Sequence, residues 1–459
     1  MNTIVLVIVV AAGLSLAGQE ADAQSRATAT RSDLEAVQTQ MQALTERLNR
    51  LEAANTELKT ENAELKSLVD RRDAETDYLK AQTKELREEA AVAGNEIAKV
   101  KGSDWATKIK ARGDLRYRHE QIHPERAVTT DGVTTVEDAE DRYRHRIRAR
   151  LGFDAQVSDN LKTTLLFATG ADDPRSSNQT LGASSTRKTI GVDMAYADWT
   201  FAQGANLVLG KQPYPFIRPG QSLFFDGDFN PEGAAAKFER GILFGDAYAW
   251  WLEERYNASP SGENADTFVY GAQLGLRMPM FDASKLVAFA HYYDCSVCQN
   301  RSPLFNNSAN GNTTFQLPEN PTNFLVFDYE IAELGAEFNT QIGSLPLQLW
   351  GNYAQNMASG VEHDTAYGLG FRLGRASNPR TWEVGAMYQS IDKDALFGQF
   401  VDSDFGDGRT DSEGWVLRGG YAPVRNIALN LQYFINTLNK DVGSELDYER
   451  LQLDMNWKF

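Results

Sequence analysis

The stretch Tyr143-Arg-His-Arg-Ile-Arg-Ala-Arg-Leu-Gly-Phe-Asp-Ala-Gln-Val157 alternates with a period of two residues. Its apolar and aromatic side chains occupy one set of alternate positions, and most of its Arg, Asp and Gln side chains occupy the other. Successive side chains of a β-strand point to opposite faces of a sheet. The pattern therefore predicts a long strand with one apolar face and one charged face.

The same alternation appears in Ile109-Lys-Ala-Arg-Gly-Asp-Leu-Arg-Tyr-Arg-His119 and recurs to the end of the chain, with turn signals between the segments. We predict sixteen strands, over residues 106–120, 141–157, 161–171, 190–201, 205–213, 233–240, 243–256, 266–279, 284–294, 325–340, 345–356, 364–374, 380–391, 413–422, 426–438 and 446–459.

The connections between these strands alternate in length along the chain. Those after odd-numbered strands are mostly long, such as 121–140, 172–189 and 392–412, whereas those after even-numbered strands are short, such as 158–160. Outer-membrane barrels combine short periplasmic turns with longer external loops, and a soluble β-sandwich has no reason to keep this phase. The last strand also alternates and stops on Phe459, as such barrels commonly do. The sequence predicts an all-β transmembrane barrel of 16 antiparallel strands.

The composition excludes other classes of protein. The chain has 459 residues, a formal net charge of −17 and a mean hydropathy of −0.45. After roughly the first two dozen residues there is no run of about 18 apolar residues, which excludes a helical membrane protein. A barrel reads as hydrophilic on average because lumen-facing polar residues alternate with lipid-facing ones. The acidic balance argues against nucleic acid as a partner.

Residues 1–23 resemble a secretory signal peptide. An apolar segment, Ile4 to Leu16, is followed by the small-x-small cleavage site Ala21-Asp22-Ala23. The segment before it has no Lys or Arg, so either the α-amino group supplies the positive charge or the true start differs. We expect an exported protein.

Residues 24–104 carry one heptad register, which predicts a coiled coil. A narrow stripe of apolar positions needs a partner helix, so a single solvated helix does not explain it. Asn55 and Asn62 at a positions favour a parallel alignment but leave dimer and trimer open. The a and d positions are Leu34, Val37, Met41, Leu44, Leu48, Leu51, Asn55, Leu58, Asn62, Leu65 and Val69, and the register continues through Leu79, Leu86, Ala90, Ala93, Ile97 and Val100. Residues 105–459 then form the barrel domain.

Two further motifs are weak. Cys295-Ser-Val-Cys298 is compatible with a local disulfide, a free redox pair or half of a metal site. The loop 402–413 faintly resembles a calcium loop, but Gly406 stands where a ligand belongs, so we predict a solvated acidic loop and no metal. The sequence has no G-x-S-x-G, H-E-x-x-H or Walker motif. We expect no catalytic residues, no enzyme activity and no cofactor.

Several of these segments resemble the putative porin family of Gram-negative outer membranes. The resemblance rests on Lys110-Ala-Arg-Gly-Asp-Leu-Arg-Tyr-Arg118, on 142–154, on Ala195-Tyr-Ala-Asp-Trp199 and on Leu209-Gly-Lys-Gln-Pro213. It is densest over 105–240 and rests on architecture alone beyond that point. It implies a homotrimer of sixteen-stranded barrels and passive diffusion, and a coiled coil often accompanies such barrels. It implies no particular substrate.

Positive charge is concentrated on one face of the first two predicted strands. The opposite faces are apolar and would meet lipid, so the basic face should line the lumen. The predicted pore-lining residues are Lys110, Arg112, Arg116, Arg118, Arg142, Arg144, Arg146, Arg148 and Arg150. Two compatible interpretations remain: a salt-bridge network that stiffens the wall, or a basic wall that raises the local concentration of anions.

The third long connection, 214–232, is too apolar for a solvated loop because it contains Leu223, Phe224, Phe225 and Phe229. In sixteen-stranded porins the third loop folds into the barrel and narrows it. We predict that this loop packs its apolar side chains on the wall and turns its acidic residues toward the arginines. Alternatively, the loop caps the barrel or contacts a neighbouring subunit. The predicted constriction residues are Asp226, Asp228 and Glu232.

These observations predict an outer-membrane porin, with passive ion transport and solute diffusion through an Arg-lined lumen. The coiled coil would lie in the periplasm, and the barrel would contact lipid and lipopolysaccharide. Peptidoglycan contact through the coiled coil is a further hypothesis. The alternatives are an envelope tether or adhesin with the barrel as an anchor, and an outer-membrane enzyme. The sequence does not indicate the solute, the ion selectivity or the pore size.

Overall fold

A computed structural model describes residues 30–99, 108–256, 258–264, 266–281, 283–296, 298–305 and 308–459. The predicted signal peptide, 1–23, lies outside the described residues. Contacts divide the chain into two units, Met1–Lys101 and Gly102–Phe459. We describe each unit by itself.

The first unit contains one helix, α1 (Thr30–Lys99), of 70 residues. Several of its apolar side chains, including Leu65, Leu79 and Leu86, are more than half exposed in the single chain. Many other a and d positions lie among the side chains that are not described, so the coiled coil remains a prediction. No helix of the described residues is long and apolar enough to span a membrane.

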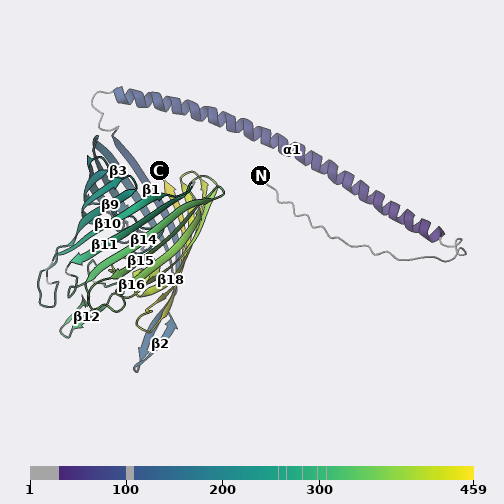
Figure 1. Ribbon diagram of the computed structural model, residues 1–459. Coiled ribbons are helices and arrows are strands. Elements are labelled where there is room, and N and C mark those ends of the chain that lie inside the picture. Colours follow the sequence, from purple (N-terminus) through teal and green to yellow (C-terminus); the bar gives the residue numbers. More distant parts are fainter. Residues whose placement is uncertain are drawn as a thin grey trace. The chain divides into compact units, whose positions relative to one another are not determined.

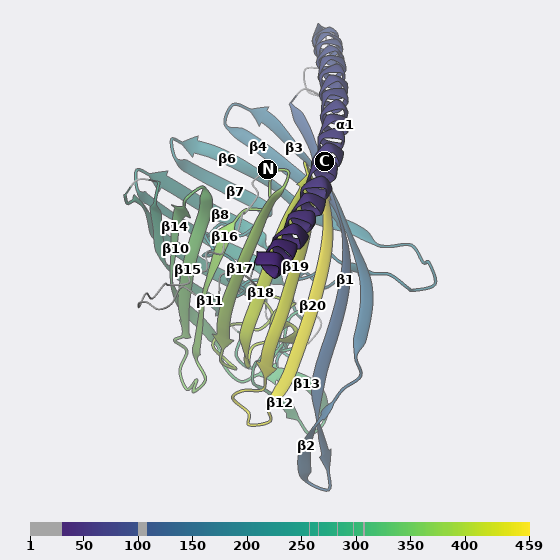
Figure 2. The same ribbon diagram turned by 90° about the vertical axis from the view of Figure 1, so that its right-hand side faces the viewer.

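The second unit is a closed antiparallel barrel, because β1 pairs with both β3 and β20. Figure 1 shows the strands, and Figure 2 shows β19, β20 and β1 running side by side. The sixteen strands of the wall are β1 (Ile109–Thr130), β3 (Arg142–Ser158), β4 (Leu161–Thr169), β6 (Ile190–Ala202), β7 (Ala205–Lys211), β8 (Glu232–Arg240), β9 (Leu243–Glu253), β10 (Thr267–Pro279), β11 (Lys285–Ser296), β14 (Tyr329–Ile342), β15 (Leu345–Asn356), β16 (Thr365–Gly374), β17 (Thr381–Ile391), β18 (Ser412–Val424), β19 (Ile427–Leu438) and β20 (Leu446–Lys458). The predicted 16-stranded barrel is confirmed.

The prediction was wrong at the first long connection, 121–140. In the structure β1 continues to Thr130 and pairs with β2 (Val133–Asp138) as a hairpin. Asp131 and Gly132 form the turn with positive φ angles of 52° and 80°. An Asp-Gly pair suits the two-residue turn of a hairpin, and β-branched residues on both sides extend the pairing.

The connections between the wall strands contain further short elements. These are β5 (Gln179–Thr180), which pairs with β3, the hairpin of β12 (Thr314–Leu317) and β13 (Asn320–Leu325), and the 3-10 turn η1 (Phe405–Gly408). Long connections follow β4, β7, β11 and β17, and short turns follow β3, β6 and β8. We call the two ends of the barrel the loop end and the turn end.

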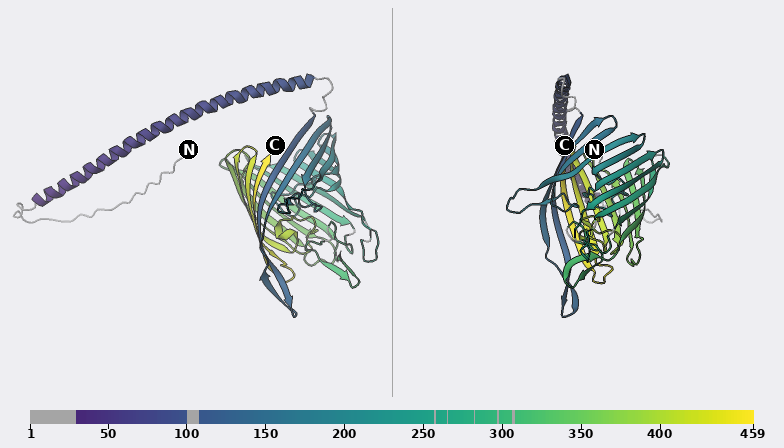
Figure 3. Two further views of the ribbon diagram at one scale, coloured as in Figure 1. Left: turned by 180° about the vertical axis from the view of Figure 1, so that it is seen from behind. Right: turned by 90° about the vertical axis from the view of Figure 1, so that its left-hand side faces the viewer.

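The two faces of the wall differ in exposure. On β9, Leu243 and Trp251 are exposed on the outer face, whereas Phe244 and Trp250 are buried on the inner face. The apolar outer face suits lipid, as the alternation predicted. Trp250 belongs to one core cluster with Phe225 and Phe400 from long connections, whereas Phe244 packs with Val287 and Phe289. Figure 3 shows connecting segments within the ring of strands.

Candidate functional site in the barrel lumen

The connection 212–231 crosses the inside of the barrel, because it contacts distant parts of the wall. The backbone N–H of Gly220 donates to Glu337 on β14 at 2.7 Å, and that of Leu223 donates to Gln389 on β17 at 3.1 Å. Asp228, farther along the same connection, lies 3.6 Å from Arg148 on β3. We call this connection the inner loop.

Aromatic residues anchor the inner loop to the β9–β11 sector. Phe225 lies 5.6 Å from Tyr293 between ring centroids, and Phe216 lies 4.3 Å from the ring of His291. His291 is itself fixed by hydrogen bonds to Tyr248 at 2.8 Å and Glu333 at 3.1 Å. The apolar side of the inner loop is therefore packed against the wall. This packing fixes the orientation of its acidic side.

Asp226 of the inner loop is buried and Asp228 is half-buried, and both are hydrogen-bonded. Asp228 accepts from the backbone N–H and the hydroxyl of Ser177, at 3.1 and 2.7 Å. Asp226 accepts from the backbone N–H of Asp228 and of Ser403, both at 2.7 Å. Glu232 does not belong to the loop: it is the first residue of β8 and its side chain is exposed. The strand ladder reaches one residue farther than predicted, because Glu232 pairs with Lys211 on β7.

A second acidic connection, 392–411, meets the inner loop, and the sequence did not indicate this role. Asp404 lies 3.0 Å from Arg118 and 2.7 Å from Arg450. Asp402 accepts from the backbone N–H groups of Asp404 and Phe405. Two arginines thus neutralise the part of the chain that faintly resembled a calcium loop. The described residues contain no group of His, Cys, Asp or Glu side chains that could hold a metal ion.

Most of the predicted basic wall is paired with carboxylates. Arg118 binds Asp454 on β20 at 2.7 Å, and Arg144 and Arg450 both bind Glu120. Glu120 is 0% exposed, so these charges face each other rather than water.

Asp114 on β1 neutralises a second pair of arginines. Arg148 and Arg150 on β3 approach it at 2.9 and 2.8 Å. Arg112 pairs with Asp154 at 2.7 Å near the turn end. For these residues the contacts match the salt-bridge interpretation.

The remaining predicted pore-lining residues have other surroundings. Arg116 donates to the Asn178 amide oxygen at 2.6 Å and lies 4.0 Å from Asp454 on β20, and Arg146 donates to the Ser176 hydroxyl at 3.1 Å. The structure leaves three predicted residues exposed: Lys110, Arg112 and Arg142.

Three cavities that share lining residues lie between the two ends of the barrel. The loop-end cavity, of about 240 Å³, is lined by Asp172, Asp193 and Lys211 among others, and it shares Asp228 with the central cavity. The central cavity, of about 170 Å³, has arginines on one side and the two acidic connections on the other. Its charged lining residues are Arg116, Arg118, Arg175, Asp226, Asp228, Asp402 and Asp404.

The third cavity, of about 390 Å³, lies toward the turn end. It shares Leu223, Gly227, Asp402 and Gln432 with the central cavity. The turn-end cavity contains two arginines that the sequence analysis missed, Arg218 and Arg418. No local pattern marks them, because each is a single arginine within an uncharged stretch. The three cavities together form a series through the lumen.

Burial changes the charge of the acidic connections. Burial, together with the negative charge of Asp402, raises the pKa of Asp226 well above its usual range. Burial and the neighbouring Asp404 raise the pKa of Asp402 to about 6. Burial would also raise the pKa of Asp404, but Arg450 and Arg118 outweigh it and lower that pKa. The acidic side of the central cavity thus carries less negative charge near neutral pH than its residue count suggests.

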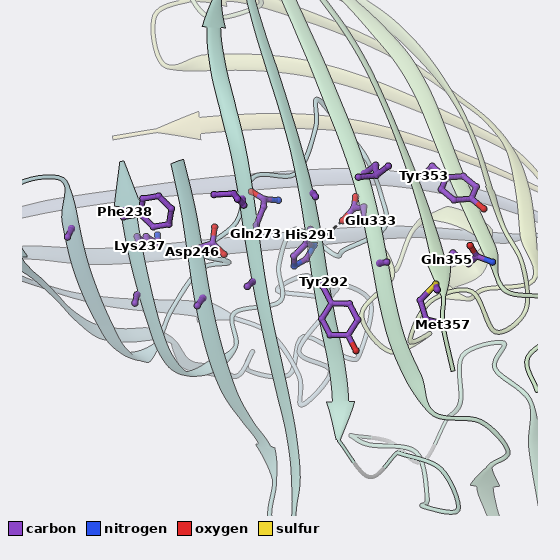
Figure 4. Close-up of a pocket in the computed structure, with 18 of the residues that line it drawn as sticks. Lys237, Phe238, Asp246, Gln273, His291, Tyr292, Glu333, Tyr353, Gln355 and Met357 are labelled. Carbon is purple, nitrogen blue, oxygen red and sulfur yellow. Dashed lines mark hydrogen bonds and ion pairs between the residues drawn. The ribbon is translucent and has the colours of Figure 1, made fainter. Parts of the chain in front are cut away.

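A separate hollow of about 860 Å³ lies along β8–β15 (Figure 4). Its outward-facing side chains are apolar and include Ala247, Ala272 and the exposed Leu274. The polar His291 and Glu333 belong to the inner face of the same strands. This hollow is on the outer face of the wall, so it is not part of the lumen series. Near the loop end of the same sector, Cys295 and Cys298 form a disulfide, which was one of the three interpretations left open.

The chain matches the family model described as "Putative porin" over residues 19–326 and 327–459. Among solved structures, OprB of Pseudomonas putida is 12% identical with a TM-score of 0.49, covering 77% of this chain and 95% of that one. The outer membrane channel DcaP of Acinetobacter baumannii is 10% identical with a TM-score of 0.46, covering 76% and 97%. OmpT of Vibrio cholerae is 11% identical with a TM-score of 0.44, covering 76% and 97%. No curated protein matches the sequence significantly.

Proposed function

Because the chain belongs to the Putative porin family, we propose that it is an outer-membrane porin through which small hydrophilic solutes and ions diffuse passively. The observation that carries this proposal is the series of three cavities inside a closed barrel. They share Asp228 at one junction and Leu223, Gly227, Asp402 and Gln432 at the other. A barrel that served only as an anchor would need no such charged interior.

Part of the selectivity is proposed to arise at the central cavity, where the Arg-lined wall lies opposite the acidic inner loop. Arg116 and Arg118 on β1 line one side of it, and Asp228 of the inner loop lines another. Opposite charges across a narrow lumen produce a transverse field that acts on permeating ions and dipolar solutes. Fixed side chains serve this role better than mobile ones, and Asp228 is held by two hydrogen bonds from Ser177.

The proposed assembly is a homotrimer in the outer membrane. The apolar outer face of the barrel would contact lipid and lipopolysaccharide. The helix α1 would form a parallel coiled coil in the periplasm, since Leu65, Leu79 and Leu86 need apolar partners that the single chain does not supply. Peptidoglycan is a proposed contact of that coiled coil.

Single-channel recording in planar lipid bilayers tests the proposal. The purified full-length protein should insert with discrete conductance steps, in groups of three if each insertion delivers a trimer. Heat-denatured protein from the same preparation is the matched control and should give none. Native protein that inserts, as judged by protection from protease, and yet conducts no current would contradict the porin. Binding of that protein to peptidoglycan would then favour the envelope tether.

A further inference from the structure

Two arginines of the β16–β18 sector face the lumen at the same level of the wall. Arg372 on β16 and Arg418 on β18 both pair in register with Gly385 on β17. Neighbouring strands are about 4.8 Å apart, so the two Cα atoms are separated by roughly 10 Å. Gly385 has no side chain to fill the space between them, so both guanidinium groups have room to turn toward the lumen.

The hydrogen-bond partners of Arg418 are neutral. Arg418 donates to the Gln432 amide oxygen at 3.2 Å and to the backbone carbonyl of Gln221 at 3.3 Å. Among the described residues, neither Arg418 nor Arg372 has a carboxylate oxygen within 4.0 Å. The guanidinium group of Arg418 is therefore held in place by neutral groups, and neither arginine makes a direct ion pair in the described part of the chain.

The inner loop adds a third guanidinium group. Arg218 donates to the backbone carbonyl of Phe225 at 2.7 Å and lies 5.3 Å from the centre of the Tyr214 ring. In the described part of the chain it also lacks a carboxylate partner within 4.0 Å. A carbonyl and an aromatic face position the group but leave its other N–H donors available.

The turn-end cavity lies between Arg218 and Arg418, which both line it. Its volume of about 390 Å³ is within the range of small-molecule sites. Leu223 offers an apolar contact and Asn430 offers an amide, whereas the side chain of Leu431 is exposed on the outer face. The remaining charged lining residues are Glu383 and Asp402. The lining thus holds two guanidinium and two carboxyl groups, and Arg372 lies outside the lining, across Gly385 from Arg418.

We infer that the turn-end cavity is a binding site for small organic monocarboxylates, held by Arg418 and Arg218, with the positive charge of Arg372 at the same level of the wall. This inference rests on the proposed porin function, since the site lies in the proposed permeation path. Guanidinium groups bind carboxylates through paired, charge-assisted hydrogen bonds. The neutral partners of Arg418 keep its guanidinium group oriented. The carboxylate of the solute can then form the direct ion pair that this arginine lacks. A permeating monocarboxylate thus pauses at the site, and an uncharged molecule of the same size does not.

The test measures efflux of two co-loaded probes, glucuronate and glucose, from proteoliposomes that contain the full-length protein. These probes are similar in size and differ in a carboxylate. In the R372Q/R418Q variant, the glucuronate-to-glucose ratio should fall about tenfold, as expected when charge-assisted hydrogen bonds are lost. Lysine at both positions should restore part of the ratio. The matched control is R380Q/R425Q, which removes two exposed arginines from turns at the same end of the barrel.

The outcomes separate the two claims. Wild-type vesicles that release neither probe would overturn the porin and this site with it. Wild-type vesicles that release both, with an unchanged ratio in folded R372Q/R418Q, would overturn the site alone. Folding is read from the heat-dependent mobility of the barrel on denaturing gels. If the double variant does not fold, the single variants R218Q and R418Q are measured instead. Each should lower the glucuronate-to-glucose ratio by a few-fold, and an unchanged ratio in both would overturn the site.

Discussion

Two sectors of the barrel wall that carry inward-facing arginines use them differently. In the β20–β1–β3 sector, which we call the paired wall, Arg118 and Arg450 contact Asp404, and Glu120 lies between Arg144 and Arg450. In the β16–β18 sector, which we call the open wall, the arginines have neutral partners or none within hydrogen-bond distance. The paired wall has far more positive residues, but most of them are bound to carboxylates. The arginines of the open wall remain available to bind a solute.

The comparison shows that the number of arginines in a strand does not determine the charge of the surface that it builds. On the paired wall, carboxylates from three different strands and a loop arrive at the same level as the arginines. Such buried pairs are costly to break, because one partner is left as an isolated charge. We therefore assign the paired wall to stability, loop placement and the transverse field at the central cavity, and the open wall to recognition of charged solutes.

The largest effect is expected from breaking the paired wall at its centre. Replacing Glu120 by Gln keeps the shape but removes the charge that Arg144 and Arg450 share. The free energy of unfolding should fall by about 3–5 kcal/mol, as for other broken buried pairs. Urea titration of the folded barrel in detergent measures it. Glu232→Gln removes a 63% exposed partner of Lys211 and should cost less than about 1 kcal/mol. An equal loss of unfolding free energy in the two variants would contradict the stabilising role assigned to the paired wall.

Ion selectivity is expected to respond most at the open wall. In a salt gradient, the chloride-to-potassium permeability ratio should fall about fivefold in R372Q/R418Q, because two positive charges without a direct ion pair are lost. Replacing Arg144, Arg146 and Arg148 by Gln should also shift selectivity toward cations, but by less. Reversal potentials in planar bilayers measure both. A larger shift from the triple variant would assign the pore field to the paired wall.

A smaller effect is expected from pH. The pKa of Asp402 is raised to about 6, so its carboxyl group is neutral below that pH and becomes charged as the pH rises through it. Chloride permeability relative to potassium should therefore fall by up to about twofold between roughly pH 5 and roughly pH 7. Asp402→Asn retains the side-chain oxygen that accepts from Asp404 and Phe405 and should abolish the step. A step of unchanged size in that variant would assign the titration to another group.

The sequence predicted the strands well because alternation is a local property. The predicted span 345–356 coincides with β15, and most other bounds differ by a few residues. The hairpin of β1 and β2 was missed because the length of 121–140 suggested a loop, although Asp131-Gly132 is a turn signal. The resemblance pointed to the correct family and to the inward course of the inner loop.

The partners of the arginines could not be predicted in the same way. Arg118 binds Asp454, which is 336 positions away in the sequence. That contact depends on closure of the barrel and on the register of β1 against β20. The role of 392–411 depends on loop packing inside the lumen, for which no local pattern exists. The open wall was missed for the opposite reason, since Arg372 and Arg418 are isolated in their own strands.

The central claim is that solutes pass through the lumen beside the inner loop, and Gly227 tests it most directly. Gly227 lines both the central and the turn-end cavities, and an added Cβ would meet nothing closer than an Arg218 nitrogen at 3.9 Å. The native cysteines are joined in a disulfide, so Gly227→Cys supplies a unique free thiol.

Single-channel current is recorded from Gly227→Cys before and after a charged methanethiosulfonate reagent is added. The exposed loop variant Val442→Cys serves as the control. Our account predicts that labelling removes most of the current in Gly227→Cys and leaves the control unchanged. Full labelling of Gly227→Cys, verified by mass spectrometry, with an undiminished current would contradict it.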